Sequence, residues 1–413
     1  MDTNMSKPIN KSEHASIKQI TGGVTAPKGF KAAGTACHIK QSGRKDMAIV
    51  MSDKPAAAAA MFTTNKMAAA PVYLSKKHVA DGSIQAVVIN SGNANACTGE
   101  QGEKDAEKMA EVAGHALGIN PQDIIVESTG IIGVPMPMDK VEEGIRVAAV
   151  KLSADGGSDA AEAIMTTDLF AKEFTVVFEL DGKEVKMGGM AKGSGMIAPN
   201  MATMLAVITT DAKISAPMLS IALKNAVEKS FNSITVDGDT STNDMVAVLA
   251  NGASGAEVAN ENAEIFQEAL DLVCIELAKM IVRDGEGATK FIEIEVVGAA
   301  SNADAKIAAM SVANSNLVKT AFFGQDANWG RIVAAVGYSS AEVDQTKIDV
   351  YYGSERLVEN GRVADYDAVK IDETIKAKDI KVRIDLKLGN GTARVWTCDF
   401  SYDYVRINAE YHT

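Results

Sequence analysis

Short β-branched segments bounded by Gly, Asn or Asp are the feature of this chain that most restricts its fold. Such segments are typical of strands. The five clearest are 83–90, 174–180, 204–210, 244–251 and 291–298. Apolar residues also recur at helical spacing in 103–118, 217–231 and 263–282. Strands followed by helices and then by strands predict mixed α/β layers rather than a strictly alternating doubly wound sheet.

The last hundred residues are expected to be rich in strands. The segments that carry this expectation are 347–353, 380–388 and 393–411. A chain of 413 residues exceeds the size at which one core usually stops growing, so two domains or two closely packed halves are expected. A soft boundary is predicted near 181–203, where Gly, Lys and Met gather between two strand-like segments.

Composition excludes several classes of protein. With 46% apolar residues the chain is too hydrophobic to be disordered, and no apolar segment approaches the roughly 18 residues of a membrane helix. The first twenty residues are polar and lack the apolar core of a signal peptide, so we expect a cytoplasmic protein with no membrane partner. A net charge of −13 without a basic patch argues against nucleic acid as a partner.

The thiols and imidazoles of the chain do not predict a metal site. Cys37, Cys97, Cys274 and Cys398 are scattered without a CxxC pair, which favours reduced and mostly buried thiols. The five histidines are equally dispersed, and His115 lies just off the apolar stripe of its predicted helix. We therefore expect no metal, and a histidine at position 115 that is exposed or partly buried.

Common catalytic motifs are absent from the sequence. The glycines at 193 and 195 follow Lys192 in the order KGSG, which is not the order of a phosphate-binding P-loop. No GxGxxG or GxSxG motif occurs in a fitting context. Acids and alcohols alternate in 236–244 without the spacing of a calcium loop. A turn or a helix-capping cluster is the favoured interpretation of that segment, and a substrate-facing loop is the alternative.

One remaining segment could supply a nucleophile. Thr203 follows the small residue Ala202 and precedes an apolar strand, which is the arrangement that self-cleaving N-terminal nucleophile enzymes use. Attack of the hydroxyl on the preceding carbonyl would leave threonine as a new N-terminus. Its α-amine, with an ordinary pKa of about 7.7–8.0, could then act as the base for its own hydroxyl. Taken alone this signal is weak, because threonine commonly begins a strand.

The segment around this threonine resembles a known signature. KGSGMIAPNMATMLAVITTDA (192–212) is similar to the cleavage-site signature of the glutamate N-acetyltransferase / ornithine acetyltransferase family. Seven other segments match the same family in the same order. They are 24–30, 88–99, 127–133, 237–244, 283–291, 319–332 and 407–413. The resemblance runs from about residue 21 to the end of the chain, and residues 1–20 are expected to form a flexible polar tail.

The resemblance implies an enzyme that cleaves itself between Ala202 and Thr203. An α fragment (21–202, after the tail) would carry an oxyanion hole, and a β fragment (203–413) would begin at the nucleophile. Acetyl would pass from N-acetylornithine to Thr203 and then to glutamate, which gives ornithine and N-acetylglutamate in arginine biosynthesis. The implied fold is a layered α/β sandwich shared with certain self-cleaving aminopeptidases. The implied assembly is a heterotetramer of two α and two β fragments.

The resemblance also implies which residues form the site. The oxyanion hole would be Thr129 and Gly130. The substrate contacts would be Thr166, Lys192, Thr203, Glu286, Asn408 and Thr413. As hypotheses for their roles, Lys192 holds a carboxylate, Glu286 pairs with the ornithine ammonium, and Thr166 fixes the backbone end of the substrate. Asn408 and Thr413 would close the pocket.

Acyl transfer of this kind needs a nucleophile, a base and oxyanion donors, so no cofactor or metal is expected. Acetyl-CoA remains open as a second acetyl donor. Two alternative functions also remain open at this point. The first is an amidohydrolase or aminopeptidase that uses the same threonine with water as acceptor, and the second is a non-catalytic binder of acetylated amino acids.

Overall fold

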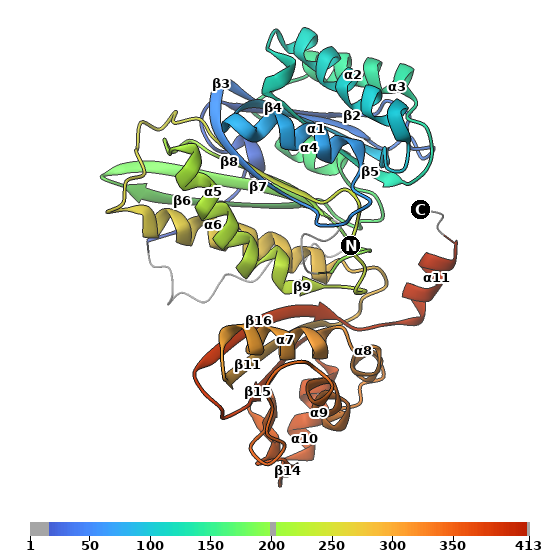
Figure 1. Ribbon diagram of the computed structural model, residues 1–413, viewed down its shortest axis with the longest axis vertical. Coiled ribbons are helices and arrows are strands. Elements are labelled where there is room, and N and C mark those ends of the chain that lie inside the picture. The colour runs from blue at the N-terminus through green and yellow to red at the C-terminus, as the bar shows by residue number, and fades with distance from the viewer. Residues whose placement is uncertain (1–15, 199–203, 411–413) are drawn as a thin grey trace.

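The computed structural model describes residues 16–198 and 204–410. Figure 1 shows an upper lobe built from the first two thirds of the chain and a smaller lower lobe built from most of the remainder. The upper lobe contains a nine-stranded sheet, and the lower lobe contains most of a seven-stranded sheet. The layered α/β fold class predicted from the sequence is therefore confirmed.

The nine-stranded sheet follows the order β1-β6-β7-β8-β10-β3-β4-β5, and β2 also pairs with β3. Its strands are β1 (Lys18–Ile20), β2 (Phe30–Thr35), β3 (Met47–Phe62), β4 (Ser83–Asn93), β5 (Ile124–Ile131), β6 (Lys172–Leu180), β7 (Lys183–Lys192), β8 (Leu205–Thr210) and β10 (Met245–Ala250). Strand β3 is long enough to pair with β2 along its first half and with β10 along its second half. It thereby joins one half of the sheet, made of β1, β6, β7, β8 and β10, to the other half, made of β2, β4 and β5.

These two halves fold over one another. Strands β7 and β5 are five positions apart in the sheet order, which in a flat sheet would separate them by about 24 Å. Nevertheless, Lys192 at the end of β7 donates a hydrogen bond of 3.3 Å to Thr129 on β5. Buried apolar side chains from β7, β8 and β10 also share one cluster with side chains from β3, β4 and β5. This shared cluster is the core between the two halves.

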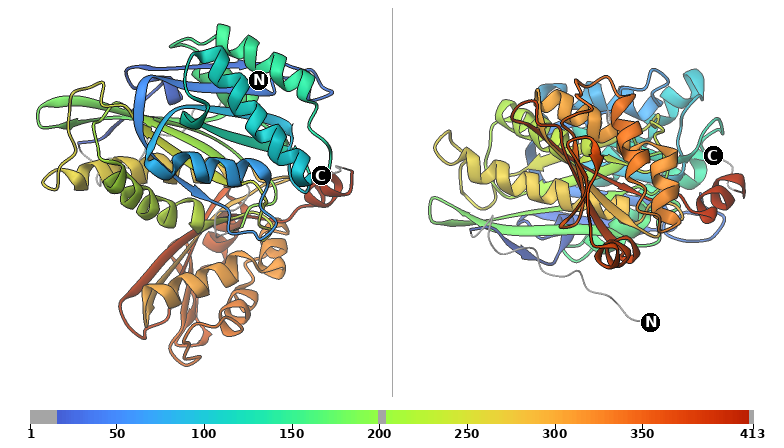
Figure 2. Two further views of the ribbon diagram at one scale, coloured as in Figure 1. Left: turned by 45° about the horizontal axis from the view of Figure 1, so that its top comes forward. Right: turned by 90° about the horizontal axis from the view of Figure 1, so that it is seen from below.

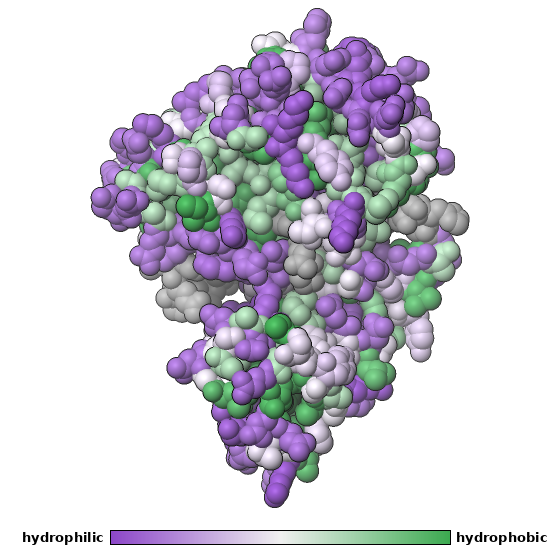
Figure 3. All heavy atoms as spheres, in the orientation of Figure 1, coloured by the Kyte–Doolittle hydropathy of each residue, from purple (hydrophilic) through white to green (hydrophobic). Residues whose placement is uncertain are grey.

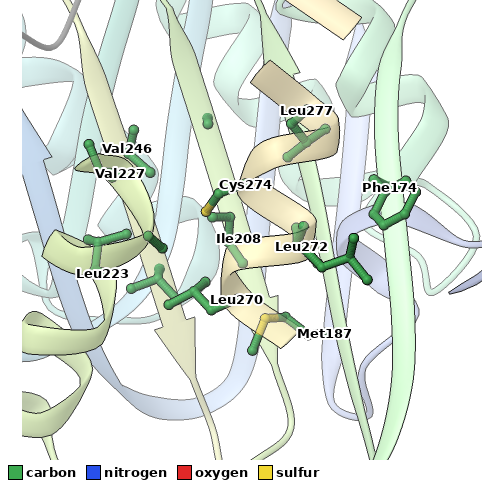
Figure 4. Packing of buried hydrophobic residues seen from close by; sticks show 14 of the residues in the cluster. Phe174, Met187, Ile208, Leu223, Val227, Val246, Leu270, Leu272, Cys274 and Leu277 are labelled. Atoms are coloured by element: carbon green, nitrogen blue, oxygen red, sulfur yellow. The ribbon is translucent and has the colours of Figure 1, made fainter. Parts of the chain in front are cut away.

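Helices cover the outer faces of the two halves. The helices of the upper lobe are α1 (Ala70–His78), α2 (Gly99–Leu117), α3 (Met138–Val150), α4 (Gly157–Ala163), α5 (Ala216–Lys229) and α6 (Ala263–Arg283). Helices α5 and α6 pack on β6, β7, β8 and β10, and Figure 4 shows Leu223, Leu270 and Leu277 of these helices against Ile208. Helices α2 and α3 pack on β4 and β5. The order of layers is helix, sheet, sheet, helix.

The lower lobe has its own core. The seven-stranded sheet contains β9 (Ile234–Thr235), β11 (Phe291–Ala299), β12 (Asp349–Tyr352), β13 (Glu355–Glu359), β14 (Arg362–Val363), β15 (Asp379–Asp385) and β16 (Gly391–Cys398). Its helices are α7 (Asn302–Ala313), α8 (Asn316–Phe323), α9 (Trp329–Gly337) and α10 (Ala368–Lys376). A last helix, α11 (Tyr402–Glu410), lies at the side of the molecule in both views of Figure 2. Short 3-10 helices occur at Gly23–Thr25, Val79–Asp81, Pro121–Asp123 and Phe231–Ser233.

The structure corrects three expectations. Segment 393–411 is not one strand, because β16 ends at Cys398 and α11 follows; the Ser401 hydroxyl accepts hydrogen bonds from the backbone N–H groups of Asp403 and Tyr404, as a helix cap does. The described residues 181–198 contain no boundary between the lobes, since β7 lies inside the upper sheet and pairs with β8. The predicted tail is too long, because residues 18–20 form β1 against β6, whereas residues 1–15 lie outside the described part.

Other expectations from composition can be compared with the described residues. The four cysteines are free thiols, of which Cys97 alone is exposed, and His115 is exposed as expected. Hydrophilic side chains cover much of the outer face of both lobes in Figure 3. No helix within 16–198 or 204–410 is long and apolar enough to cross a membrane.

Candidate active site

A small cavity of about 120 Å³ lies at the ends of β5 and β7. Six of the residues predicted for the site line it, although up to 279 positions separate them in the sequence. These residues are Thr129, Gly130, Thr166, Lys192, Glu286 and Asn408. Ala202, Thr203 and Thr413, which were also predicted, lie outside the described residues.

Lys192 is the buried cation of this cavity. It is the last residue of β7, it is 3% exposed, and its Nζ donates hydrogen bonds to the hydroxyl oxygens of Thr166 (2.8 Å) and Thr129 (3.3 Å). Burial lowers the pKa of the Lys192 ammonium. An ammonium group has three donors, and these two hydroxyls use two of them. Among residues 16–198 and 204–410 no acceptor takes the third donor, which can therefore serve an anion in the cavity.

A buried network of charges supports Lys192 and Thr166 from behind. Asp168 accepts hydrogen bonds from the backbone N–H groups of Thr166 (2.8 Å) and Gly193 (2.7 Å). Asp168 also pairs with Lys172 at 2.7 Å, and Lys172 pairs with Asp284 at 2.5 Å. Burial alone would raise the pKa of Asp168, but the nearby Lys192 and Lys172 hold it below its usual value. Asp168 therefore stays ionised and fixes the backbone beside both cavity residues.

The Thr129-Gly130 pair lies on β5, opposite Lys192. Gly130 has φ +135°, and a Cβ placed on it would lie 2.3 Å from the carbonyl carbon of Gly92, so this position requires glycine. The side-chain amide of Asn243 donates to the backbone carbonyl of Ser128, the residue just before the pair, at 2.8 Å. The close approach of Gly92 and the hydrogen bond from Asn243 thus fix the backbone around Thr129 and Gly130. Such a fixed backbone suits a preformed binding site for the negative charge of an oxyanion.

Glu127 lies two residues before Thr129 and is completely buried. Neither of its carboxylate oxygens has a hydrogen-bond partner among the described residues. Burial raises its pKa well above the usual value and so favours the uncharged form. An uncharged side chain at this position does not repel an anion bound near Thr129.

Glu286 and Asn408 form the opposite side of the cavity. The side-chain amide of Asn408 on α11 donates to Glu286 Oε2 at 2.8 Å, and the Glu286 N–H donates to the carbonyl of Ser194 at 2.9 Å. A Cβ on Gly195 would lie 2.4 Å from the Glu286 carboxylate. Glycine at 195 therefore makes room for the only carboxylate that the sequence predicted at this site.

One wall of the cavity is made by residues that were not named individually in the predicted site. The segment 237–243 contributes Asp237, Asp239, Ser241, Thr242 and Asn243, and α11 contributes Tyr404. No helix begins in 236–244, so a capping cluster is wrong, but a turn, the other part of the favoured interpretation, is confirmed by the hydrogen bonds from the Asp239 N–H to Asp237 and from the Asn243 N–H to Ser241. The segment also faces the cavity, as the alternative interpretation expected. The alternation of acids and alcohols was the signal for this loop. Tyr404 was missed because a strand was predicted for its segment.

Comparison with known proteins gives the family of the chain. The ArgJ family matches residues 31–413. The arginine biosynthesis bifunctional protein ArgJ of Symbiobacterium thermophilum is 53% identical over 402 residues, which cover 96% of this chain and 100% of that protein. The protein of the same name from Caldanaerobacter subterraneus is 50% identical and covers 95% of this chain and 99% of its own length.

A solved structure is similar over part of the chain. The ornithine acetyltransferase of Mycobacterium tuberculosis, complexed with ornithine, is 40% identical and covers 44% of this chain and 98% of the solved one, with a TM-score of 0.41. The family match and the two bifunctional relatives extend over nearly the whole chain. The chain belongs to the ArgJ family.

Proposed function

We propose that this chain is a self-cleaving acetyltransferase of arginine biosynthesis. It moves acetyl from N-acetylornithine to glutamate through an acetyl-Thr203 intermediate. Membership of a family whose relatives are named bifunctional arginine biosynthesis proteins supports this proposal. The observation that carries it is one cavity that combines the Thr129-Gly130 pair, the buried cation Lys192 and the Glu286–Asn408 pair.

The charges of this cavity match those of the donor substrate. N-acetylornithine has a carboxylate, an amide and a distal ammonium group. Lys192 offers its remaining donor to the carboxylate or to the developing oxyanion, and Glu286 offers a carboxylate to the ammonium. A charge-assisted hydrogen bond of this kind is stronger than a neutral one.

Thr129 has a defined role in stabilising the oxyanion. Because Lys192 donates to Thr129 Oγ1, the hydrogen of the Thr129 hydroxyl is free to be donated to another acceptor. That hydrogen and the backbone N–H of Gly130 are the two donors proposed for the tetrahedral intermediates. Lys192 polarises the first of them, so its charge acts on the reaction through Thr129.

The proposed chemistry balances without an added oxidant or reductant. The Thr203 hydroxyl attacks the acetyl carbon, its proton passes to the Thr203 α-amine, and the ornithine nitrogen takes that proton as it leaves. The α-amine of glutamate then attacks the acetyl-enzyme, and N-acetylglutamate leaves with the hydroxyl restored. No step uses a resident cofactor, and acetyl-CoA would serve only as an alternative acetyl donor.

Both fragments of the proposed cleavage contribute to the site. The fragment before residue 203 contains Thr129, Gly130, Thr166 and Lys192, and the later fragment contains Glu286, Asn408 and, by resemblance, Thr413. Such a site works only while the two fragments remain together. We further propose a heterotetramer of two α and two β fragments as the working assembly.

The nucleophile can be tested by substitution. Thr203→Ala is expected to abolish both cleavage and acetyl transfer, whereas Thr203→Ser keeps a hydroxyl and an amine and should retain both at reduced rates. The assay follows labelled acetyl from N-acetylornithine into N-acetylglutamate. Transfer by Thr203→Ala at the wild-type rate would contradict the proposal. Release of acetate at an undiminished rate without glutamate would show a hydrolase instead.

A further inference from the structure

Three segments that are distant in the sequence supply part of the cavity wall, and one buried lysine connects them. Segment 166–169 contains two lining residues, segment 192–196 contains three, and segment 284–286 contains Glu286. Lys172 lies at the start of β6 and is completely buried. Its contacts reach all three segments through two carboxylates.

The ammonium group of Lys172 joins these two buried carboxylates directly. Its Nζ donates to Asp168 at 2.7 Å and to Asp284 at 2.5 Å, and all three side chains are fully buried. A longer contact of 3.4 Å reaches the backbone carbonyl of Phe170. An ammonium group has three donors, and these contacts use all of them. Lys172 can therefore act on a substrate only through its neighbours.

Asp168 holds the two segments that carry the cation of the cavity. It accepts hydrogen bonds from the backbone N–H groups of Thr166 (2.8 Å) and Gly193 (2.7 Å). Gly193 directly follows Lys192, whose Nζ donates to the Thr166 hydroxyl at 2.8 Å. The position of the Lys192 ammonium group therefore depends on Asp168 through both of its backbone contacts.

Asp284 holds the segment that carries the anion of the cavity. Both of its carboxylate oxygens accept the backbone N–H of Leu169, at 3.0 and 3.2 Å. Glu286 follows two residues later, and its own N–H donates to the carbonyl of Ser194 at 2.9 Å. The position of the Glu286 carboxylate relative to the other two segments thus depends on Asp284 and on the lysine that binds it.

The distance between this cation and this anion bears on the choice of substrate. N-acetylornithine would reach from Lys192 to Glu286, so the length of its methylene chain must match their separation. A site that is fixed at both ends rejects a chain that is one methylene longer or shorter, typically by about 10–200-fold. A site whose ends can move adapts to several chain lengths.

We propose that Lys172 is a positioning residue that sets the distance between Lys192 and Glu286 and thereby selects the length of the acetylated diamino acid. It takes no part in bond making or breaking, and acts through Asp168 and Asp284. This inference rests on the proposed function and deepens it, because it names the group that lets the site distinguish N-acetylornithine from its homologues.

The test compares three acetyl donors with glutamate as acceptor. They are N-acetylornithine, the shorter homologue Nα-acetyldiaminobutyrate and the longer homologue Nα-acetyllysine. Wild type should favour N-acetylornithine over each homologue by at least about tenfold in kcat/KM. Lys172→Met should raise KM for N-acetylornithine at least about tenfold and reduce the preference to less than about threefold. A general loss of packing would lower the rates for all three donors alike and leave the preference unchanged.

A second variant breaks the same link while keeping the charges balanced. Lys172→Met alone leaves two buried carboxylates without their shared cation, which is strongly destabilising. Adding Asp284→Asn removes one charge of each sign and leaves Asp168 with Lys192, which is near enough to lower the pKa of Asp168. This double variant should show the same loss of preference, and it decides the question if Lys172→Met does not fold. Circular dichroism and thermal unfolding check the fold of both variants.

Lys290→Met is the matched control. Lys290 is 7% exposed, and its Nζ donates to the backbone carbonyls of Lys376 and Ala377 at 2.8 Å each, in the lower lobe. Its replacement should lower the melting temperature but keep the preference for N-acetylornithine. An equal loss of preference in Lys290→Met would overturn the inference, because it would indicate a general effect of losing a buried lysine.

The outcomes separate this inference from the proposed function. If wild type transfers acetyl and the Lys172 variants keep its preference among the three donors, the inference is wrong and the proposed function stands. A wild type that uses all three donors equally well would also overturn the inference alone. If wild type transfers no acetyl from N-acetylornithine to glutamate, the proposed function itself fails and this inference falls with it.

Discussion

At the scale of single residues, the site depends on a buried cation that contacts two hydroxyls. Lys192 is 3% exposed and donates to Thr129 and Thr166. Burying an ammonium group is unfavourable unless its surroundings compensate, and Asp168 provides a nearby negative charge within the same buried network. The free-energy cost of burying Lys192 has a functional reason if its remaining donor binds an anion during the reaction.

Replacing this cation tests that role. Lys192→Met keeps the length of the side chain but removes the charge that polarises Thr129, so kcat/KM for transfer should fall about 100-fold or more. Lys186→Met, which changes a partly exposed lysine of the same strand, is the matched control and should stay near wild type. Steady-state rates at several concentrations of both substrates measure the effect. An unchanged kcat/KM for Lys192→Met would show that the charge plays no part.

Single residues of the site could not be found from physical chemistry alone. A lysine or glutamate is normally solvated, and nothing in the local sequence of Lys192 or Glu286 indicates burial. Only the resemblance to a known family predicted that Thr129, Gly130 and the substrate contacts belong to one site. Glu127 was not predicted, because a single acid inside a β-branched strand has no distinctive pattern.

At the scale of elements, a glycine and a short helix shape the cavity. Gly195 makes room for the Glu286 carboxylate, and α11 brings Asn408 to the same carboxylate. Helix α11 has no buried residue along its described length, so its position depends on a few contacts. These include the stacking of Phe400 on Tyr404 and the edge contact of Tyr402 with Phe323.

A methyl group at position 195 should disturb this arrangement. In Gly195→Ala the new Cβ would lie 2.4 Å from the Glu286 carboxylate, so this carboxylate must move away from Asn408. We expect KM for N-acetylornithine to rise at least about tenfold, with a smaller change in kcat. Gly337→Ala is a suitable control, because a Cβ there meets no atom within 4 Å. Equal KM values for Gly195→Ala and wild type would contradict the proposed contact.

The helices and central strands were predictable because their side chains repeat with a clear period. Helix α2, predicted over 103–118, spans Gly99–Leu117, and α6, predicted over 263–282, spans Ala263–Arg283. Helix α11 was not predictable in this way, because Tyr402, Tyr404 and Val405 favour strands by composition. Its start is set by the Ser401 hydroxyl, a local contact that outweighs those preferences.

At the scale of the whole molecule, the two proposed fragments are interleaved. Strand β7 before residue 203 pairs with β8 after it, and β3 pairs with β10. The buried Lys172 also joins the fragments by its ion pair with Asp284. Removing one partner of such a buried pair typically costs about 3–5 kcal/mol, so these contacts oppose separation. Cleavage would therefore leave a single associated particle.

The division into lobes was only partly predictable. Length alone indicated two units, but the Gly- and Met-rich segment near 181–203 indicated the wrong boundary. That segment contains β7, whose glycines at 188 and 189 lie where a Cβ would strike the backbone of Gly23 or the side chain of Leu277. Its unusual composition therefore reflects close packing and the adjoining cavity rather than a linker.

The central claim is that the chain cleaves itself before Thr203, and the intact mass of the purified protein tests it most directly. Under denaturing conditions we expect two polypeptides of about 21 and 22 kDa, corresponding to residues 1–202 and 203–413 of the 43.4 kDa chain. The second polypeptide should begin at Thr203, and under native conditions the two polypeptides should elute as one complex in size-exclusion chromatography. A single 43.4 kDa chain that transfers acetyl from N-acetylornithine to glutamate at full rate would contradict the claim.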